Sequence, residues 1–190
     1  MTDRELLTAL LAERSSKKGH FVLASGRESG FYIDARLTTM SPDGLTLIGR
    51  LGLSTLQQSG WDVDAVGGLT LGADPISCAI SYASATSKHP LRAFTVRKEA
   101  KSHGTSKLIE GPFKAGDHIA VIEDVITSGG SALRAIEAIH AAGGRVSGVL
   151  AIVDREEGGR EALESTGVPV IALTTAGEIM TVLEKRVAQR

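Results

Sequence analysis

Two adjacent acids end an apolar stretch in the middle of the chain, and small hydroxyl-bearing and glycine residues follow them. The segment HIAVIEDVITSGGSALRAIEAIH, residues 118–140, contains Glu123 and Asp124 and then the turn Thr127 to Ser131. Such a turn at the start of a helix offers backbone N–H groups to a phosphate. The acids would repel that phosphate, so they suit sugar hydroxyls or a bridging Mg²⁺. The segment predicts a cradle for a phosphorylated ribose, and a solvated acidic turn is the alternative.

A second candidate is the basic segment VRKEAKSHGTSK, residues 96–107. Its cationic or titratable side chains are Arg97, Lys98, Lys101, His103 and Lys107. The segment has few apolar residues and contains a glycine, which is typical of a mobile loop that closes over a strongly anionic group such as pyrophosphate. A plain solvated loop would have a similar composition.

Two further segments follow predicted strands. VGGLTLGADPIS, residues 66–77, contains Gly67, Gly68 and Gly72, which would let the backbone approach a ligand closely. Packing alone could also require these glycines. AIVDREEGG, residues 151–159, places Arg155 after an apolar strand. A guanidinium there can hold a carboxylate through two parallel hydrogen bonds, unless Asp154 already pairs with it.

Alternating strand and helix patterns position these segments. Predicted strands are DAVGG, RAFTVRK, HIAVIED, VSGVLAIVD and VPVIALTT, and predicted helices cover about 73–85, 130–142, 158–166 and 176–188. The alternation predicts an α/β fold, with a central, mostly parallel sheet flanked by helices and ligands bound beyond the carboxyl ends of the strands. Capping patterns predict earlier helices over about 3–14 and from Pro42 to Gly60. We expect one domain overall, in which residues 1–40 form a small N-terminal hood packed on a core of residues 41–190.

Composition narrows the class of protein. The chain of 190 residues is 42% hydrophobic with a formal net charge of -1, so we expect a globular protein that binds neither nucleic acid nor membrane. The one cysteine, Cys78, excludes a disulfide framework and a cysteine-based zinc site. Charges interrupt the apolar positions of the N-terminal segment, so we expect no signal peptide and a cytoplasmic location.

Taken together, the motifs resemble those of type I phosphoribosyltransferases, and in particular the orotate phosphoribosyltransferase family. VIEDVITSGGS is similar to the motif that binds 5-phosphoribosyl 1-pyrophosphate (PRPP), and RKEAKSHG to the catalytic loop. FVLASGRESGFYIDAR is similar to the N-terminal hood segment, and DREEGG to the orotate-binding turn. The resemblance implies the Mg²⁺-dependent reaction of orotate with PRPP to give orotidine 5′-monophosphate and pyrophosphate, a step of de novo pyrimidine synthesis. It also implies a homodimer in which the basic loop of one subunit serves the site of the other.

The resemblance also implies roles for individual residues. The catalytic residues would be Lys101, His103 and Asp124. The residues that bind PRPP would be Arg97, Lys98, Lys101, His103, Glu123, Asp124, Val125, Ile126, Thr127, Ser128, Gly129, Gly130 and Ser131. Orotate would meet Thr127, Arg155, Tyr32 and Ile33. Mg²⁺ is expected to arrive mainly on PRPP, without dedicated protein ligands.

The chain departs from the family pattern at three places. Ala24 stands where some members have a lysine, Leu71 and Gly72 stand where some have Tyr-Lys, and Glu123 stands where the first acid is often Asp. Two other functions share the PRPP motif. A purine or other nucleobase phosphoribosyltransferase has no need of RKEAKSHG or of a carboxylate-binding Arg155. A PRPP-sensing regulator needs a nucleic-acid-binding element, which the net charge of -1 and the short N-terminal segment disfavour.

Overall fold

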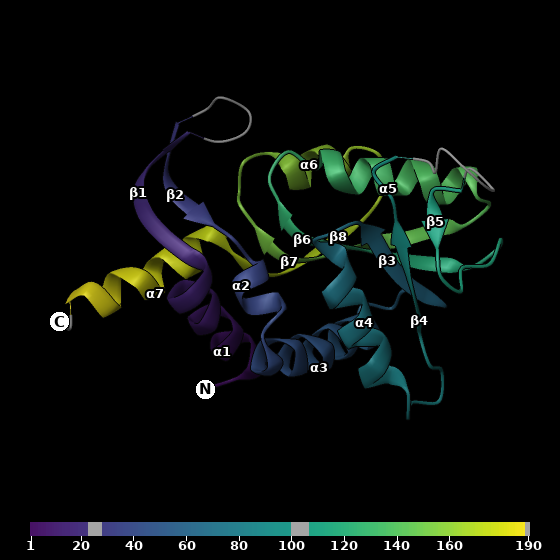
Figure 1. Cartoon of the computed structure of the whole chain (residues 1–190), viewed down its shortest axis with the longest axis horizontal. Helices are drawn as coiled ribbons and strands as arrows, with labels where there is room; N and C mark the ends of the chain where they lie inside the picture. The colour runs from purple at the N-terminus through teal and green to yellow at the C-terminus, as the bar shows by residue number, and fades with distance from the viewer. Residues whose placement is uncertain (23–27, 100–106, 189–190) are drawn as a thin grey trace.

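A six-stranded sheet forms the centre of the molecule. The computed structural model describes residues 1–22, 28–99 and 107–188, and within them the sheet has the order β5-β4-β3-β6-β7-β8 (Figure 1). Its strands are β3 (Ala65–Leu69), β4 (Arg92–Val96), β5 (Ile109–Glu110), β6 (His118–Ile126), β7 (Arg145–Asp154) and β8 (Val170–Thr175). All neighbouring strands are parallel except β4 and β5. The predicted mostly parallel sheet is therefore confirmed, and β5 is an antiparallel edge strand that the sequence did not indicate.

Helices cover both faces of this sheet. The helices are α1 (Asp3–Leu10), α2 (Arg36–Thr39), α3 (Pro42–Gln58), α4 (Ala73–Ser84), α5 (Gly130–Ala141), α6 (Gly159–Glu164) and α7 (Ala176–Ala188), with one π-helical turn, η1 (Leu11–Ser15). Figure 1 shows α5 and α6 on one side and α3 and α4 on the other. The predicted helices are confirmed with small shifts at their ends. None of the helices in the described part of the chain is both long and apolar enough to cross a bilayer.

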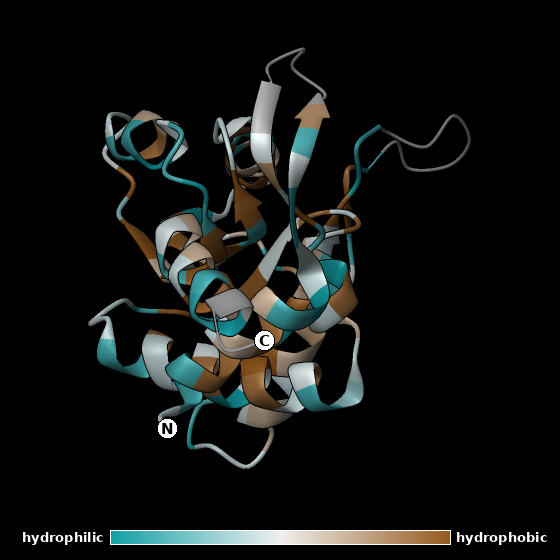
Figure 2. Ribbon diagram, turned by 90° about the vertical axis from the view of Figure 1, so that its left-hand side faces the viewer, coloured by the Kyte–Doolittle hydropathy of each residue, from teal (hydrophilic) through white to brown (hydrophobic). Residues whose placement is uncertain are grey.

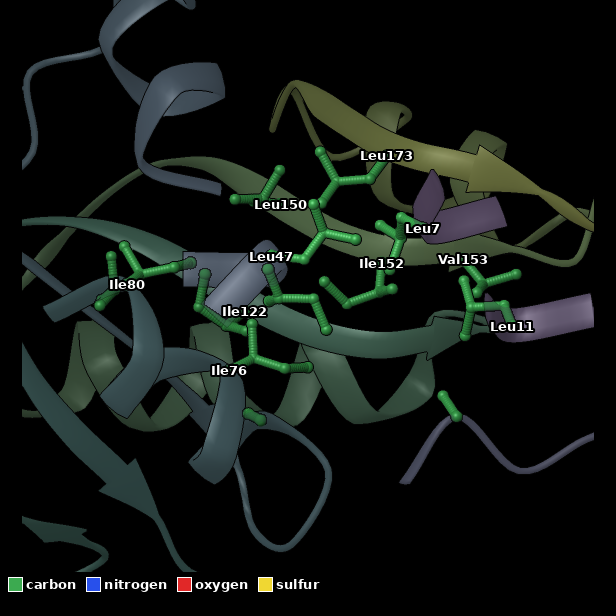
Figure 3. Packing of buried hydrophobic residues seen from close by; sticks show 14 of the residues in the cluster. Leu7, Leu11, Leu47, Ile76, Ile80, Ile122, Leu150, Ile152, Val153 and Leu173 are labelled. Atoms are coloured by element: carbon green, nitrogen blue, oxygen red, sulfur yellow. The ribbon is translucent and has the colours of Figure 1, made fainter. Parts of the chain in front are cut away.

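Alternation along the central strands fixes which face each helix covers. Ile119 of β6 belongs to the cluster that contains Ile139 of α5, whereas Ile122 belongs to the cluster that contains Ile76 of α4. Figure 3 shows the cluster that contains Ile122, in which Ile122 and Leu150 lie among side chains from α3 and α4. Full burial of one such side chain stabilises the fold by roughly 1.5–3 kcal/mol. Figure 2 colours the ribbon by hydropathy, and many of the apolar residues lie toward the middle of the molecule.

The first part of the chain adds a helix and a hairpin to this core. Thr2 and Glu5 form the predicted capping box, and α1 continues into η1. Leu7 and Leu11 of this segment are fully buried in the cluster that contains Ile122. Strands β1 (Ser16–Val22) and β2 (Glu28–Ile33) form an antiparallel hairpin that projects beside the carboxyl ends of β6 and β7 (Figure 1). The sequence did not indicate this hairpin, since apolar and polar residues do not alternate regularly along it.

Candidate active site

A cleft of about 330 Å³ lies at the carboxyl ends of the central strands. It is bordered by the end of β2, the loops after β3 and β6, and the turn after β7. The predicted site residues that line it are Tyr32, Ile33, Lys98, Glu123, Asp124, Val125, Thr127, Ser131 and Arg155. A larger hollow of about 700 Å³ lies near Trp61 and Asp64, at the amino end of β3, and it has none of these groups. These predicted residues therefore gather at one edge of the sheet.

The turn between β6 and α5 forms a small hollow beside the cleft. It has a volume of about 70 Å³ and is lined by residues from Glu123 to Ser131, which include Ile126, Ser128 and Gly130. Gly129, the residue just before α5, has a positive φ of 78°, a conformation that favours glycine. A Cβ at this position would lie 2.9 Å from the carbonyl oxygen of Gly159. The hollow combines a helix N-terminus with hydroxyl groups, an arrangement suited to one phosphate.

The two acids occupy different environments. Glu123 is buried, and this burial together with the neighbouring charge of Asp124 raises the pKa of Glu123 to about 9. Asp124 is half-buried and its Oδ1 accepts a hydrogen bond of 2.9 Å from the backbone N–H of Val125. Glu123 is therefore neutral at pH 7 in the unliganded protein. The structure thus avoids burying two like charges side by side.

The raised pKa makes stability depend on pH, and Glu123→Gln is expected to remove that dependence. Between the ordinary pKa of 4.5 and the folded value of about 9, the folded state keeps a proton that the unfolded chain releases. The free energy of unfolding of the wild type therefore falls as pH rises through this window. Glutamine stays neutral, so the variant should match the wild type near pH 4.5 and exceed its stability at pH 8 by roughly 2–4 kcal/mol in urea unfolding.

The matched control is Glu137→Gln, which changes an exposed acid on α5. This control should leave the pH dependence of the free energy of unfolding unchanged. If the difference between Glu123→Gln and the wild type did not grow with pH, the pKa of Glu123 would not be raised in solution.

Arg155 lies in the turn after β7 and is buried. Its Nε donates to Glu157 Oε1 at 2.8 Å, and its Nη2 donates to the backbone carbonyl of Phe31 in β2 at 3.2 Å. The acid that pairs with Arg155 is thus Glu157, whereas Asp154 accepts a 2.8 Å hydrogen bond from the backbone N–H of Glu156. The guanidinium is placed where the hairpin meets the core, at the wall of the cleft.

The hairpin supplies the opposite wall of this part of the cleft. Ile33 is buried, and Tyr32 is partly exposed with its ring 5.4 Å, centroid to centroid, from the ring of Phe21. Asp34 and Arg36, which follow the hairpin in the sequence, also line the cleft. Hydrogen bonds from Arg36 hold the pKa of Asp34 below its ordinary value. An apolar and aromatic wall with a guanidinium at its edge suits a planar ring that carries a carboxylate.

The glycine-rich segment corrects one prediction. Gly67 and Gly68 lie inside β3 rather than after it, and a Cβ at Gly67 would lie 2.5 Å from the carbonyl oxygen of Phe94 in β4. These two glycines therefore serve strand packing. Gly72 alone reaches the cleft, and a Cβ there would lie 2.5 Å from Cγ and Oδ1 of Asp124.

The basic segment is described only at its two ends. Lys98 is exposed and lines the cleft, whereas Arg97 lies 3.7 Å from Glu110 through Nη1 and is not among the residues that line it. Lys101 and His103 lie outside the described residues, as does Ala24. Their predicted contacts with pyrophosphate stay predictions.

Sequence reasoning missed three polar residues of the cleft besides Asp34. These are Arg36, Thr70 and Arg134. Arg134 follows Ser131 by three positions on α5, and this spacing places both side chains on one helix face. Helical spacing could therefore have identified Arg134. Arg36 begins the short helix α2 and Thr70 lies in the turn after β3, and the sequence does not reveal that these two segments reach the cleft.

The chain is similar to known proteins along nearly its whole length. No protein-family model matches it. An orotate phosphoribosyltransferase of Aquifex aeolicus (strain VF5) is 44% identical over 183 residues, which cover 95% of this chain and 99% of that protein. One from Synechocystis sp. (strain ATCC 27184 / PCC 6803 / Kazusa) is 46% identical over 184 residues, covering 96% of this chain and 91% of that protein.

A solved structure extends this similarity to the fold. The orotate phosphoribosyltransferase of Mycobacterium tuberculosis H37Rv, in complex with PRPP, matches with a TM-score of 0.77 and 38% identity. The match covers 94% of this chain and 99% of that one. Identity of this size over nearly all of the chain shows that the chain belongs to the orotate phosphoribosyltransferase family.

Proposed function

We propose that the chain transfers ribose 5-phosphate from PRPP to N1 of orotate, giving orotidine 5′-monophosphate and pyrophosphate for pyrimidine synthesis. The observation that carries the proposal is the single cleft in which the acid pair, the turn after β6 and Arg155 meet. The test is the loss of orotate absorbance when protein, PRPP and Mg²⁺ are combined. Adenine, guanine and hypoxanthine in place of orotate form the control, because a purine enzyme would consume one of them instead.

We assign different parts of the cleft to the two substrates, PRPP and orotate. We assign the 5-phosphate to the hollow formed by Thr127 to Ser131, and the ribose hydroxyls to Glu123 and Asp124. A neutral Glu123 can donate as well as accept a hydrogen bond, which suits a hydroxyl group better than a second carboxylate would. Orotate is assigned to the space between Arg155 and the hairpin residues Tyr32 and Ile33.

In the proposed reaction, the bond between C1 of the ribose and the pyrophosphate oxygen breaks ahead of bond formation. The departing pyrophosphate keeps the bonding electrons. Orotate N1 then attacks C1 from the opposite face and inverts it, and the N1 proton is released and balances the protonation of pyrophosphate. Lys98, Lys101 and Arg97 are proposed to stabilise the charge that grows on pyrophosphate, and His103 to donate a proton to one of its oxygens. Closure of the loop would exclude water, which otherwise competes with orotate for C1.

The metal is assigned to the substrate rather than to a protein cage. Within residues 1–22, 28–99 and 107–188, no three His, Cys, Asp or Glu side chains are grouped as metal ligands. Asp124 and PRPP oxygens could share a Mg²⁺ ion that keeps several waters, as this ion usually does. Bound there, Mg²⁺ would neutralise charge on the leaving pyrophosphate.

This assignment predicts that Mg²⁺ alone binds weakly. Calorimetric titration of the protein with MgCl₂ should show little heat, because the described residues offer no group of three or more metal-ligating side chains. The same titration in the presence of PRPP should show binding. Tight, stoichiometric uptake of Mg²⁺ without PRPP would contradict the assignment.

We further propose that the protein acts as a homodimer whose basic loops serve the neighbouring sites. The test mixes two inactive proteins, Lys101→Ala and Asp124→Asn, under conditions in which subunits exchange. If the loop acts in trans, each mixed dimer has one site with both defects and one with neither. We therefore expect activity to return toward half that of the wild-type dimer in the mixed species.

Subunit exchange must be verified independently, for instance by mass spectrometry of dimers that carry one tagged chain. Lys101→Ala mixed with Lys101→Ala in a differently tagged chain is the control and should stay inactive. Verified exchange without recovered activity would mean that Lys101 serves the site of its own chain.

A further inference from the structure

An acid that pairs with Arg155, a residue of the cleft wall, has no role assigned to it yet. Glu157 accepts a 2.8 Å hydrogen bond from Nε of Arg155, and the two side chains are 22% and 7% exposed. By contrast, the Arg160–Glu164 pair on α6 has the same Nε–Oε1 contact at 2.9 Å, but its side chains are 41% and 44% exposed. Exposed pairs of this kind contribute little to stability. The buried position of the Arg155–Glu157 pair calls for another explanation.

The guanidinium of Arg155 is held from two directions. Its Nε donates a hydrogen bond to Glu157, and its Nη2 donates one to the backbone carbonyl of Phe31 in β2. A planar guanidinium binds a carboxylate through two of its N–H groups. The strength of this binding therefore depends on which edge of the guanidinium faces the ligand. A contact at Nε selects the edge formed by the two terminal nitrogens. The Phe31 contact fixes the plane of the group against the hairpin that contains Tyr32 and Ile33.

The turn after β7 is built so that Glu157 folds back onto Arg155. Glu156, between them, has a positive φ of 59°, which is uncommon for a residue other than glycine. Its backbone N–H donates to Asp154, and its Oε2 accepts a 2.9 Å hydrogen bond from the backbone N–H of Gly177 at the start of α7. These contacts hold a backbone conformation of the kind that persists only where the surrounding structure imposes it.

From this geometry we infer that Glu157 is a positioning residue for orotate: by holding Nε of Arg155 it turns Nη1, and the N–H of Nη2 that does not bind Phe31, toward the carboxylate of the substrate. The inference rests on the proposed function and goes beyond it. Glu157 acts through Arg155 and need not touch orotate.

A purely electrostatic role for Glu157 makes the opposite prediction. A carboxylate next to Arg155 repels the incoming carboxylate of orotate, so its negative charge by itself would weaken substrate binding. Removing the charge should then improve orotate binding, and moving the charge slightly should matter little. Two conservative substitutions of Glu157 can therefore separate the effect of its charge on orotate binding from the effect of its contact with Arg155.

Glu157→Gln keeps the acceptor oxygen at the same distance along the side chain and loses the charge. Glu157→Asp keeps the charge and withdraws the oxygen by one methylene group. If Glu157 positions Arg155, the KM for orotate should rise about tenfold or more in Glu157→Asp and stay within about threefold of wild type in Glu157→Gln. The KM for PRPP should change little in either variant, because the turn after β6 and the acid pair are untouched.

The corresponding variants of the exposed pair, Glu164→Asp and Glu164→Gln, serve as matched controls and should leave both KM values unchanged. Thermal unfolding of all four variants separates a loss of folding from a loss of positioning. The inference is overturned if Glu157→Asp leaves the KM for orotate unchanged, or if Glu157→Gln raises it as much as Glu157→Asp does. The proposed function fails by a different result, namely a wild-type protein that does not consume orotate at all.

Discussion

Replacing Arg155 with alanine is expected to raise the KM for orotate by about 10²-fold or more, because a hydrogen bond to a charged group contributes roughly 1.5–3 kcal/mol and the proposed clamp has two. The KM for PRPP should change far less, since Arg155 lies at the hairpin side of the cleft and the 5-phosphate hollow is formed by Thr127 to Ser131. Steady-state rates with each substrate varied in turn give both values.

The loss of Arg155 also leaves Glu157 in a partly buried site without this partner. The free energy of unfolding of the variant should therefore be measured alongside its kinetics, because breaking a buried pair destabilises a protein. Arg160→Ala removes an arginine from the exposed pair on α6 and is the matched control. A folded Arg155→Ala protein with a normal KM for orotate would remove Arg155 from the substrate site.

The second large effect is expected from Gly72→Ala. A Cβ at this position would lie 2.5 Å from Cγ and Oδ1 of Asp124, closer than any tolerated contact, so the carboxylate must move. The backbone of Gly72 is in the right-handed helical region, with φ of -61° and ψ of -42°, so alanine is not excluded by its own conformation. We expect kcat/KM for PRPP to fall by about 10- to 100-fold, the effect of losing one hydrogen bond to a charged group.

Folding should be retained, because the displaced atoms are the end of a flexible side chain at the surface of a cleft. Gly30→Ala in β2 is the control, since a Cβ there meets nothing within 4 Å. This comparison tests whether the position of Asp124 matters, with its charge left intact. Unchanged PRPP kinetics in a folded Gly72→Ala protein would show that the carboxylate can shift without cost, and would weaken its assignment to the ribose.

The sequence by itself determined the class of fold and the edge at which the site lies. Strand-and-helix alternation predicted the parallel sheet, and parallel strands bring all their carboxyl ends to one edge. The acid pair lies near the carboxyl end of β6, the turn follows β6 and Arg155 follows β7, so these groups had to converge. Local signals were equally direct at the capping box of Thr2 and Glu5 and at the Ser41 cap before Pro42.

The tertiary structure decided the contacts between residues that are far apart in the chain. No local pattern indicates that Phe31 binds Arg155, that Gly72 lies against Asp124, or that Gly67 is required by Phe94. The same holds for the state of Glu123, which looks like an ordinary surface acid in the sequence. Its pKa is raised because the sheet buries it beside Asp124, and burial is a property of the assembled fold. The sequence indicated the acid pair, the turn after β6 and Arg155 as groups of the cleft, whereas packing added Asp34, Arg36, Thr70 and Arg134 and decided the charge, the orientation and the spacing of all of them.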